Sequence, residues 1–320
     1  MLNVVGSVRH FNPQNRQNLM SDFYAVAIAN PAAGRGKIRT SLPRIRHAFA
    51  HRGITDFYET TTAGEEAILA QRAIAAGCKT IIAVGGDGTC SQIANAIVES
   101  QSDCVLAVLV AGTGNDFAKT IGVSHHTADQ IAELVARGQS TRIDVGSIDG
   151  RHFLNSCGFG FDASVLDASN RVKFLKGDAV YIYSALKQLF TYEGIDVSAD
   201  RLAIGAGRRL LMVTVSNGQF LGGAFKIAPH ASVIDGELDV CLITNSGVLA
   251  RIRLFAGALR GKHLGLPSVT SGKVNDLTLT FAEPPAMELD GELRVARSNV
   301  VRLRCAPRAL SVIAAPGVIR

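Results

Sequence analysis

From Phe23 to about Arg142, short apolar runs alternate with segments of helical periodicity, and this alternation constrains the fold more than any other feature. The expected strands read FYAVAIAN, ITDFYETT, TIIAVGG and CVLAVLVAG, and the expected helices read KIRTSLPRIRHAFAHRG, GEEAILAQRAIAAG, SQIANAIVES and HTADQIAELVARG. Strands this apolar are buried on both faces, and strand–helix alternation is typical of a parallel sheet covered by helices. The sequence therefore predicts an α/β domain over residues 23–142.

After this domain the pattern changes to short strands separated by turns. The expected strands are IDVGSI, RHFLNSCG, LLMVTVSN, GELDVCLIT, VNDLTLTF and NVVRLRC. They predict a mostly antiparallel, sandwich-like β domain over 143–305, interrupted by helical segments near 173–191 and 247–263. The last apolar run, ALSVIAA, suits a strand that returns to the first domain, so we expect 306–320 to complete it and 1–22 to form a flexible leader.

Composition narrows the functional classes. The 320 residues are 47% hydrophobic and carry a net charge of +6, which argues against disorder and favours anionic partners such as phosphates or acidic lipids. Six cysteines are scattered singly without a C-x-x-C spacing, so we expect neither a zinc site nor a redox pair. No run of about eighteen apolar residues occurs. We expect a cytoplasmic protein, bound peripherally to membranes at most, that does not bind nucleic acid.

The loop GGDGT, from Gly85 to Thr89, joins the third expected strand to its helix. Backbone N–H groups at such a junction attract anions, and glycines let phosphate oxygens approach the backbone closely. The carboxylate of Asp87 fits this setting if it binds Mg²⁺ or receives a proton from a substrate hydroxyl, and Thr89 offers a hydroxyl to phosphate. The alternative is an ordinary strand–helix turn in which Asp87 is the helix N-cap.

Two further polar loops follow neighbouring strands, NPAAGRGK after the first and AGTGNDFAK after the fourth. The carboxyl ends of parallel strands meet at one edge of the sheet, where α/β proteins bind ligands. The positions expected on this rim are Asn30, Gly34, Gly86, Asp87, Thr89, Gly112, Thr113, Asn115 and Asp116. None of the loops matches a Walker A motif or G-x-G-x-x-G, which excludes a P-loop enzyme and a standard dinucleotide fold.

These three loops resemble the nucleotide-site motifs of the diacylglycerol kinase catalytic family, which includes bacterial lipid kinases, sphingosine kinases and ceramide kinases. NPAAGRGK, VGGDGT and GTGNDFA occur in the family's order, and the resemblance extends from Phe23 to the C-terminus. GGDG alone is shared with NAD kinases and phosphofructokinases, so the combination carries the resemblance. It implies a nucleotide-binding α/β domain of the NAD-kinase/phosphofructokinase type and a β-sandwich-like domain, with ATP and lipid meeting between them.

The resemblance also implies which residues contact the nucleotide. It marks Thr60, Gly85, Gly86, Asp87, Gly88, Thr89, Cys90, Ser91, Gln92 and Thr113. Relatives commonly carry Asn-Glu where this chain has Ser91-Gln92, and Pro-x-Gly-Thr where Val110-Ala111 precede Gly112. Both differences adjoin the nucleotide site, so they bear on nucleotide affinity or preference.

Three Asp-Gly pairs in the predicted β domain each predict a turn. The first, Asp149-Gly150, shows no feature beyond a plain hairpin signal. The second lies in HASVIDGELDV, which resembles the family's metal loop. That resemblance implies Mg²⁺ at the carboxylate of Asp235, with Ser232 and Glu237 contributing through backbone carbonyls or nearby water.

The third Asp-Gly pair lies in MELDGEL, which resembles the motif that supplies the family's acid–base group. A lipid hydroxyl that attacks the γ-phosphate needs a carboxylate to receive its proton. The resemblance implies Glu292 in that role, with Asp290 orienting it or binding metal. Asp87 is a competing base, because it adjoins the expected γ-phosphate.

Two segments of the second half combine apolar and basic residues at helical spacing, NRVKFLKGDAVYIYSALKQLF and GVLARIRLFAGALRGKHLG. In the second, charge around the apolar face comes from Arg251, Arg253, Arg260 and Lys262. Such helices either lie on anionic lipid or pack on their own domain with a basic edge in solvent. The sequence leaves both interpretations open.

The predicted function is an ATP- and Mg²⁺-dependent lipid kinase that phosphorylates a hydroxyl of a lipid such as diacylglycerol at the membrane surface. Anionic lipid and a second copy of the chain are its expected further partners. The alternatives are a sphingosine or ceramide kinase, an NAD kinase, and a catalytically weak protein that senses nucleotide or lipid. Only the Ser91-Gln92 difference favours the last of these.

Overall fold

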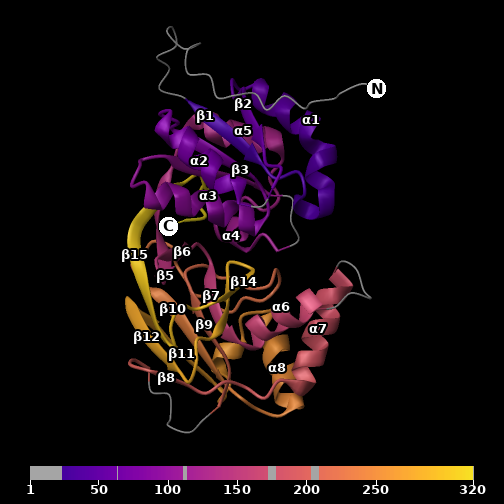
Figure 1. Ribbon diagram of the computed structural model, residues 1–320, viewed down its shortest axis with the longest axis vertical. Coiled ribbons are helices and arrows are strands. Elements are labelled where there is room, and N and C mark those ends of the chain that lie inside the picture. The colour runs from indigo at the N-terminus through magenta and orange to yellow at the C-terminus, as the bar shows by residue number, and fades with distance from the viewer. Residues whose placement is uncertain (1–23, 63, 111–113, 172–177, 203–208, 320) are drawn as a thin grey trace.

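The computed structural model describes residues 24–62, 64–110, 114–171, 178–202 and 209–319. It has two lobes, with the first half of the chain in the upper lobe of Figure 1 and most of the second half in the lower lobe. The upper lobe contains β1 (Ala25–Ala29), a 3₁₀ turn η2 (Ala33–Gly36), α1 (Lys37–Ala50), β2 (Asp56–Glu59), α2 (Glu65–Ala75), β3 (Thr80–Gly85), α3 (Asp87–Glu99), β4 (Val105–Val110), α4 (Asp116–Thr120) and α5 (Ala128–Arg137).

The upper lobe forms as the alternation of its sequence predicts. β1 and β3 are buried along their whole length, and β2, β1, β3 and β4 pair in that order as parallel strands. Local signals set the helix ends: Thr127 and Gln130 form a capping box at the start of α5, and Gly138 ends it with a φ of 66°. The apolar faces of the helices pack on this sheet and form the first core.

The lower lobe is rich in strands. It contains β5 (Thr141–Ile148), β6 (Arg151–Phe153), β7 (Ser156–Gly160), α6 (Phe161–Arg171), α7 (Asp178–Thr191), β8 (Val197–Ala199), β9 (Leu210–Ser216), β10 (Leu238–Thr244), α8 (Val248–Ala258), a 3₁₀ turn η3 (His263–Gly265), β11 (Val269–Val274), β12 (Asp276–Phe281), β13 (Ala286–Leu289), β14 (Glu292–Val295) and β15 (Val300–Val312).

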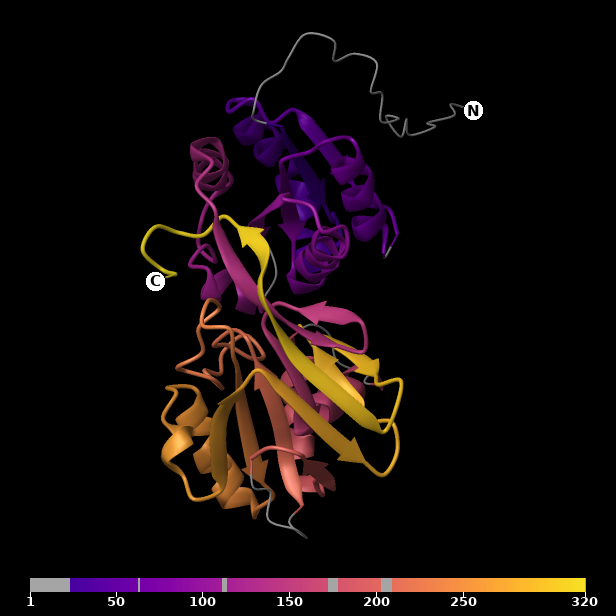
Figure 2. The same ribbon diagram turned by 90° about the vertical axis from the view of Figure 1, so that its left-hand side faces the viewer.

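Two sheets organise these strands. One is mixed and runs β2-β1-β3-β4-β15-β12-β8, with β5 and β6 beside β15; the other is antiparallel and runs β11-β10-β9-β7-β13-β14. The predicted fold class, a parallel α/β unit followed by an antiparallel β unit, is confirmed. Figure 2 shows β15 passing from the lower lobe into the upper one, where Ser311 pairs with Val105 in parallel. The proposed domain limits stay a prediction, since β5 spans the expected boundary at 142–143.

Two cores hold the lower lobe together. Phe153, Phe159, Leu279 and Val301 belong to a core between the two sheets, as in a sandwich. On the other face of the antiparallel sheet, residues such as Phe161, Met212 and Leu254 form a core with α6 and α8. The lobe therefore has three layers, and the helices lie on its outer side (Figure 1).

Three expected elements differ from the structure. RHFLNSCG is two strands, β6 and β7, in different sheets, because the backbone between them bends around the buried Asp290. The helix after GGDGT begins at Asp87 rather than near Ser91. The first helical insertion begins at Phe161, upstream of the expected 173, while residues 172–177 lie outside the described part.

Candidate active site

The GGDGT loop forms the junction between β3 and α3. Asp87 is the first helical residue and Gly86 is the N-cap, so the alternative interpretation of Asp87 as the N-cap is wrong. Within the described residues no side chain caps this end, which leaves its first N–H groups to a ligand. An added Cβ at Gly85 would lie 2.5 Å from Thr89 Oγ1, whereas one at Gly86 would meet no described atom within 4 Å. The loop is packed on its inner side and open at Gly86.

The first turn of α3 carries the other residues of this motif. Cys90 is buried, its backbone N–H donates to the Gly86 carbonyl at 3.1 Å, and burial raises the pKa of its thiol. Ser91 and Gln92 are half-buried. Burial raises the pKa of Asp290, and the nearby Ser91 side chain opposes that rise. The GGDGT helix therefore contacts the third Asp-Gly turn directly.

Glu66 is a buried residue that the sequence did not indicate. It connects the NPAAGRGK loop and the loop before α2 to GGDGT. Asn30 Nδ2 donates to Glu66 Oε1 at 3.0 Å, and the backbone N–H of Gly64 donates to Oε2 at 3.2 Å. Thr89 Oγ1 lies 3.5 Å from Glu66 Oε1. Thr60, also buried, ends the neighbouring strand. Glu66 thus holds three loops of the rim together, although its place in the sequence shows only an acid in the first turn of a helix.

The third loop contacts GGDGT through Asp87. The backbone N–H of Asn115 donates to Asp87 Oδ2 at 2.8 Å, and a Cβ on Gly114 would lie 2.8 Å from the same oxygen. Gly112 and Thr113, two predicted nucleotide contacts, lie outside the described residues. Asn30, Gly34, Asp87 and Asn115 therefore all lie on loops at the carboxyl ends of the parallel strands.

Asp116 joins this rim to the lower lobe. Its carboxylate accepts the backbone N–H of Gly223 at 3.0 and 3.1 Å and pairs with Lys119 Nζ at 3.0 Å. Lys119 also donates to the Gly223 carbonyl. Because both partners of this ion pair contact the same backbone segment, Asp116 has a structural role between the lobes.

Asp290 is the centre of a buried network in the lower lobe. Its two carboxylate oxygens accept the backbone N–H groups of Leu154 at 2.9 Å, Asn155 at 2.8 Å and Ser156 at 3.2 Å. Glu288, which the sequence analysis did not single out, is buried on the same strand and accepts the N–H of Gly291. Glu288 lies near the end of β13, two residues before Asp290 in the turn, and this close spacing of acids is the signal that could have indicated Glu288.

Glu292 lies against the GGDGT loop. A Cβ added to Gly88 would be 2.8 Å from Glu292 Oε1, so the carboxylate reaches over the first turn of α3. Its other oxygen, Oε2, pairs with Arg294. The side chain of Glu292 is 37% exposed. The two motifs that are more than 200 residues apart in the sequence therefore meet at Gly88.

Carboxylates are concentrated around this point, and burial shifts their ionisation. Burial raises the pKa of Asp87 to about 6, with a smaller contribution from the charge of Asp116. Burial also raises the pKa of Glu288 and, despite its three N–H donors, that of Asp290. Asp162, a further acid that sequence reasoning missed, has its pKa raised to about 7 by burial. So many acids in one place favour a cation.

The shift at Asp162 predicts a dependence of stability on pH. Its pKa is raised from 3.8 to about 7, so the folded state holds the proton more tightly than the unfolded chain. This favours the folded state at low pH, and the advantage is lost as pH rises from about 4 through about 7. Asp162→Asn should therefore increase the free energy of unfolding by about 1–4 kcal/mol at pH 8 and by much less at pH 4.5.

Urea unfolding at the two pH values measures this difference. Asp167→Asn is the matched control, because Asp167 is on the same helix, is 41% exposed and pairs with Arg171. It should change stability little at either pH. An equal effect of Asp162→Asn at pH 4.5 and pH 8 would contradict the assigned ionisation.

A cavity of about 580 Å³ lies between the two lobes. Its walls include the carboxylates described above and a larger apolar part. The polar side chains are Arg35, Asp87, Asp116, Asn155, Asp162, Glu288 and Asp290, and the apolar ones are Phe117, Leu154, Phe161, Val165, Leu166, Met212, Leu221, Ala224, Phe225 and Phe255. An acyl chain could pack on the apolar part while its polar end meets the carboxylates.

The predicted metal loop lies elsewhere, since none of its residues lines this cavity. Lys273 pairs with Asp235 Oδ2, and the N–H of Glu237 donates to Asp235 Oδ1 at 3.1 Å. Ser232 is half-buried nearby in the chain. Across the described ranges, no three His, Cys, Asp or Glu side chains form a ready-made metal site. A Mg²⁺ site at Asp235 therefore stays a prediction, and Lys273 would have to give up its ion pair there.

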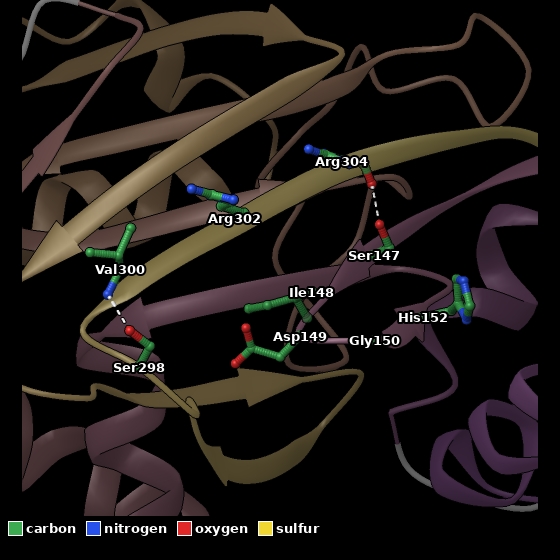
Figure 3. Close-up of a pocket in the computed structure, with 9 residues that line it drawn as sticks. All are labelled: Ser147, Ile148, Asp149, Gly150, His152, Ser298, Val300, Arg302 and Arg304. Atoms are coloured by element: carbon green, nitrogen blue, oxygen red, sulfur yellow. Dashed lines mark hydrogen bonds between the residues drawn. The ribbon is translucent and has the colours of Figure 1, made fainter.

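A second cavity, of about 630 Å³, lies on the outer face of the mixed sheet (Figure 3). Arg304 on β15, Ser147 on β5 and His152 on β6 occupy paired positions across three strands, and Ser147 Oγ donates to the Arg304 carbonyl at 3.2 Å. The plain Asp149-Gly150 turn closes one side. Few apolar side chains line this cavity, unlike the one between the lobes.

Loops of the nucleotide-binding type form one rim of a cavity whose walls are mostly apolar, with carboxylates at the end near the loops. This arrangement defines a kinase with an alcohol acceptor. Two family models match the chain: the diacylglycerol kinase catalytic domain over residues 24–148, and the YegS C-terminal NAD kinase β-sandwich-like domain over residues 155–314. The chain belongs to the diacylglycerol kinase catalytic family, and it is a lipid kinase that uses ATP.

Individual relatives agree with this assignment. A Pseudomonas aeruginosa protein named "Probable lipid kinase YegS-like" is 30% identical over 293 residues, which cover 88% of this chain and 90% of that one. The "Diacylglycerol kinase" of Bacillus subtilis (strain 168) is 29% identical over 269 residues, covering 83% and 88%. A crystal structure from Bacillus anthracis str. Sterne superposes with a TM-score of 0.73 at 25% identity, covering 93% of this chain and 100% of that one.

Proposed function

We propose that the acceptor is diacylglycerol and that the product is phosphatidic acid. The observation that carries this proposal is the cavity of about 580 Å³, whose apolar walls end at Asp87, Glu288 and Asp290 beside the GGDGT loop. The parts of the acyl chains next to the glycerol would pack on the apolar walls, while the free hydroxyl would point to the carboxylates. Several relatives are named diacylglycerol kinase, which supports the same acceptor.

We infer that Glu292 receives the proton of the attacking hydroxyl. Arg294 holds Oε2 of this side chain, and Oε1 reaches over Gly88 at the start of α3, where phosphate oxygens would meet the open helix end. Asp290 is held by three backbone donors in a buried position, so its role is to position the turn that carries Glu292. Asp87 would then contact the nucleotide and bind its cation.

Mg²⁺ would neutralise charge on the transferred phosphate when it binds with ATP. Mg²⁺ usually takes only one or two protein carboxylates together with phosphate oxygens, so a set of three protein ligands is not required. Asp87 fits this use, because burial and the charge of Asp116 raise its pKa to about 6 and a cation would relieve both effects. Asp235 is the second proposed position for Mg²⁺.

Transfer of labelled phosphate from ATP to a panel of acceptors tests the proposal. The panel contains diacylglycerol, monoacylglycerol, ceramide, sphingosine and NAD. We expect diacylglycerol to be labelled with the highest kcat/KM. Preferential labelling of sphingosine or ceramide would show that one of them, and not diacylglycerol, is the acceptor. Labelling of NAD alone would overturn the assignment of a lipid acceptor. ATP binding without any labelled product would favour a protein that senses nucleotide or lipid.

The apolar wall gives a prediction about the acceptor alone. Leu166 lines the cavity and is half-buried, so a larger side chain there can fill cavity space without disrupting the core. Leu166→Trp should raise the KM for diacylglycerol about tenfold and leave the KM for ATP unchanged, while the volume-conserving Leu166→Met should change neither. Steady-state kinetics in mixed micelles measures both constants. An equal rise in both KM values would place Leu166 outside the acceptor site.

A further inference from the structure

Exposed apolar side chains are concentrated on two helices of the lower lobe. Ten large hydrophobic residues are exposed in the described part of the chain, and six of them lie on α7, on α8 or directly after α8. These six, the apolar face, are Tyr183, Leu186, Phe190, Leu249, Ile252 and Leu259. Leu249 is 83% exposed and Phe190 is 64% exposed, which is unusual for side chains of this size.

Helical spacing places these residues in two stripes. On α7 they recur at i, i+3 and i+7, and on α8 at i, i+3 and i+10, so each stripe lies on one face of its helix. The opposite side of α8 is the one that packs inward, where Leu254 and Ala258 are buried. Both helices therefore have an inner face that the protein covers and an outer apolar face that it does not.

Arg251 fixes the two helices to one another. The sequence predicts Arg251 among the charges around the apolar face, but Arg251 is only 6% exposed, so that expectation is wrong. Its guanidinium donates to the carbonyls of Leu189 at 2.8 Å and Tyr192 at 2.6 Å at the end of α7, and to Asn245 Oδ1 at 2.7 Å. A cation at these carbonyls satisfies the free helix end. The two helices that carry the stripes therefore lie against one another (Figure 1).

Exposed basic side chains flank the apolar face. Lys187, Arg253, Arg260 and Lys262 are exposed, and none has an ion pair among the described residues. The sequence contains no Asp or Glu between residues 179 and 192 or between 240 and 275. Glu193, just after α7, is an exposed acid beside this face, so cations predominate there without being alone. An apolar face bordered mainly by cations matches an anionic lipid surface.

The same helices border the acceptor cavity. Phe255 of α8 lines the cavity, and its ring centroid is 4.9 Å from that of Phe161, another lining residue. Ile252 and Leu259 are on the outer side of the same helix. A bilayer that contacts the outer side would therefore lie within one helix width of the cavity, about 10 Å.

We propose that the apolar face on α7 and α8 docks on an anionic bilayer and holds the acceptor cavity beside its lipid; this rests on the lipid kinase function proposed above. A second copy of the chain is a poorer occupant. A two-fold contact through this face would bring each cluster of Lys and Arg against its own copy, and like charges repel. In the described ranges no helix is both long and apolar enough to cross a bilayer.

Vesicle sedimentation without ATP tests the surface independently of catalysis. The full chain is mixed with phosphatidylcholine vesicles, with or without phosphatidylglycerol. Phe190→Ser/Leu249→Ser should lower the partition coefficient about tenfold or more on vesicles of either composition. Ile68→Ser/Val318→Ser, which removes two exposed apolar residues elsewhere, should bind within about twofold of wild type. Arg253→Gln/Arg260→Gln should weaken only the binding that depends on phosphatidylglycerol, by about fivefold per cation, and reduce its salt dependence.

A second measurement separates this proposal from the kinase function. Phosphorylation of a short-chain diacylglycerol dissolved as monomers should be unchanged in the Phe190/Leu249 variant. Wild-type binding by that variant, or absence of vesicle binding by the wild type, would overturn the docking surface. A wild-type dimer that the same substitutions convert to monomer would also overturn it, in favour of a subunit interface. Loss of vesicle binding in the variant, with no kinase activity in either protein, would retain the surface and reject the kinase.

Discussion

Glu292→Gln should lower kcat for lipid phosphorylation by about 100- to 10,000-fold and leave the KM for ATP nearly unchanged. Glutamine keeps the size of the side chain and one acceptor oxygen, but it cannot receive the proton of the lipid hydroxyl. Glu292 reaches over Gly88 at the open end of α3, and its carboxylate pairs with Arg294 rather than being held by several backbone donors as that of Asp290 is. Steady-state kinetics and ATP binding, measured separately, distinguish loss of chemistry from loss of nucleotide.

Two comparison variants sharpen this result. Asp87→Asn should also reduce transfer strongly, but with a higher Mg²⁺ requirement, because we assign Asp87 to the nucleotide and its cation. Asp149→Asn alters the plain Asp-Gly turn outside the cleft and should retain wild-type activity. If Glu292→Gln keeps activity within about threefold of wild type, the role of base passes to Asp87 or Asp290.

Asp290→Ala should reduce the free energy of unfolding by about 3–5 kcal/mol. The substitution leaves three backbone N–H groups, those of Leu154, Asn155 and Ser156, without their acceptor in a buried setting. A buried donor without a partner costs about 1–3 kcal/mol, and water entering the site offsets part of the sum. The same change should release the turn that carries Glu292, so activity should fall even at temperatures where the variant stays folded.

Asp149→Ala is the matched control for stability. Asp149 and Asp290 both precede a glycine in a two-residue hairpin and have nearly the same φ, 50° and 48°. Asp149 accepts only the N–H of Arg297 at 2.9 Å, and it is half-buried. Asp149→Ala should therefore reduce the free energy of unfolding by about 1 kcal/mol. Urea unfolding of both variants separates the contribution of the buried hydrogen-bond network from that of the turn backbone. Equal losses in the free energy of unfolding would show that the network contributes nothing beyond the turn.

Local sequence features were sufficient for most of the elements and for their order. Alternation of apolar runs with helical patterns predicted the parallel unit, and the short strands with Asp-Gly turns predicted the antiparallel one. These features depend on residues a few positions apart, which is why the sequence reveals them. The common edge of the three loops was also predictable, because the carboxyl ends of parallel strands must meet there.

The buried partners were not predictable in this way. Glu66, Asp162 and Glu288 look like ordinary helix or strand acids in the sequence, and Arg251 looks like a surface charge. Their roles depend on burial and on partners that are distant along the chain, such as the 62 residues between Arg251 and Leu189. The division of RHFLNSCG into two strands has the same origin, since Asp290 lies 136 residues from the Leu154 N–H that it accepts.

The sequence by itself determined the fold class, the family and the motifs that form the nucleotide rim, because spacing and residue type along the chain are enough to specify them. Only the tertiary structure decided that Glu292 meets Gly88, that several carboxylates converge on one apolar cavity, and that α7 and α8 share an uncovered apolar face. The physical reason is that burial, shifted pKa values and long-range hydrogen bonds are properties of neighbours in space. β15, by returning through both lobes, is the element that brings those neighbours together.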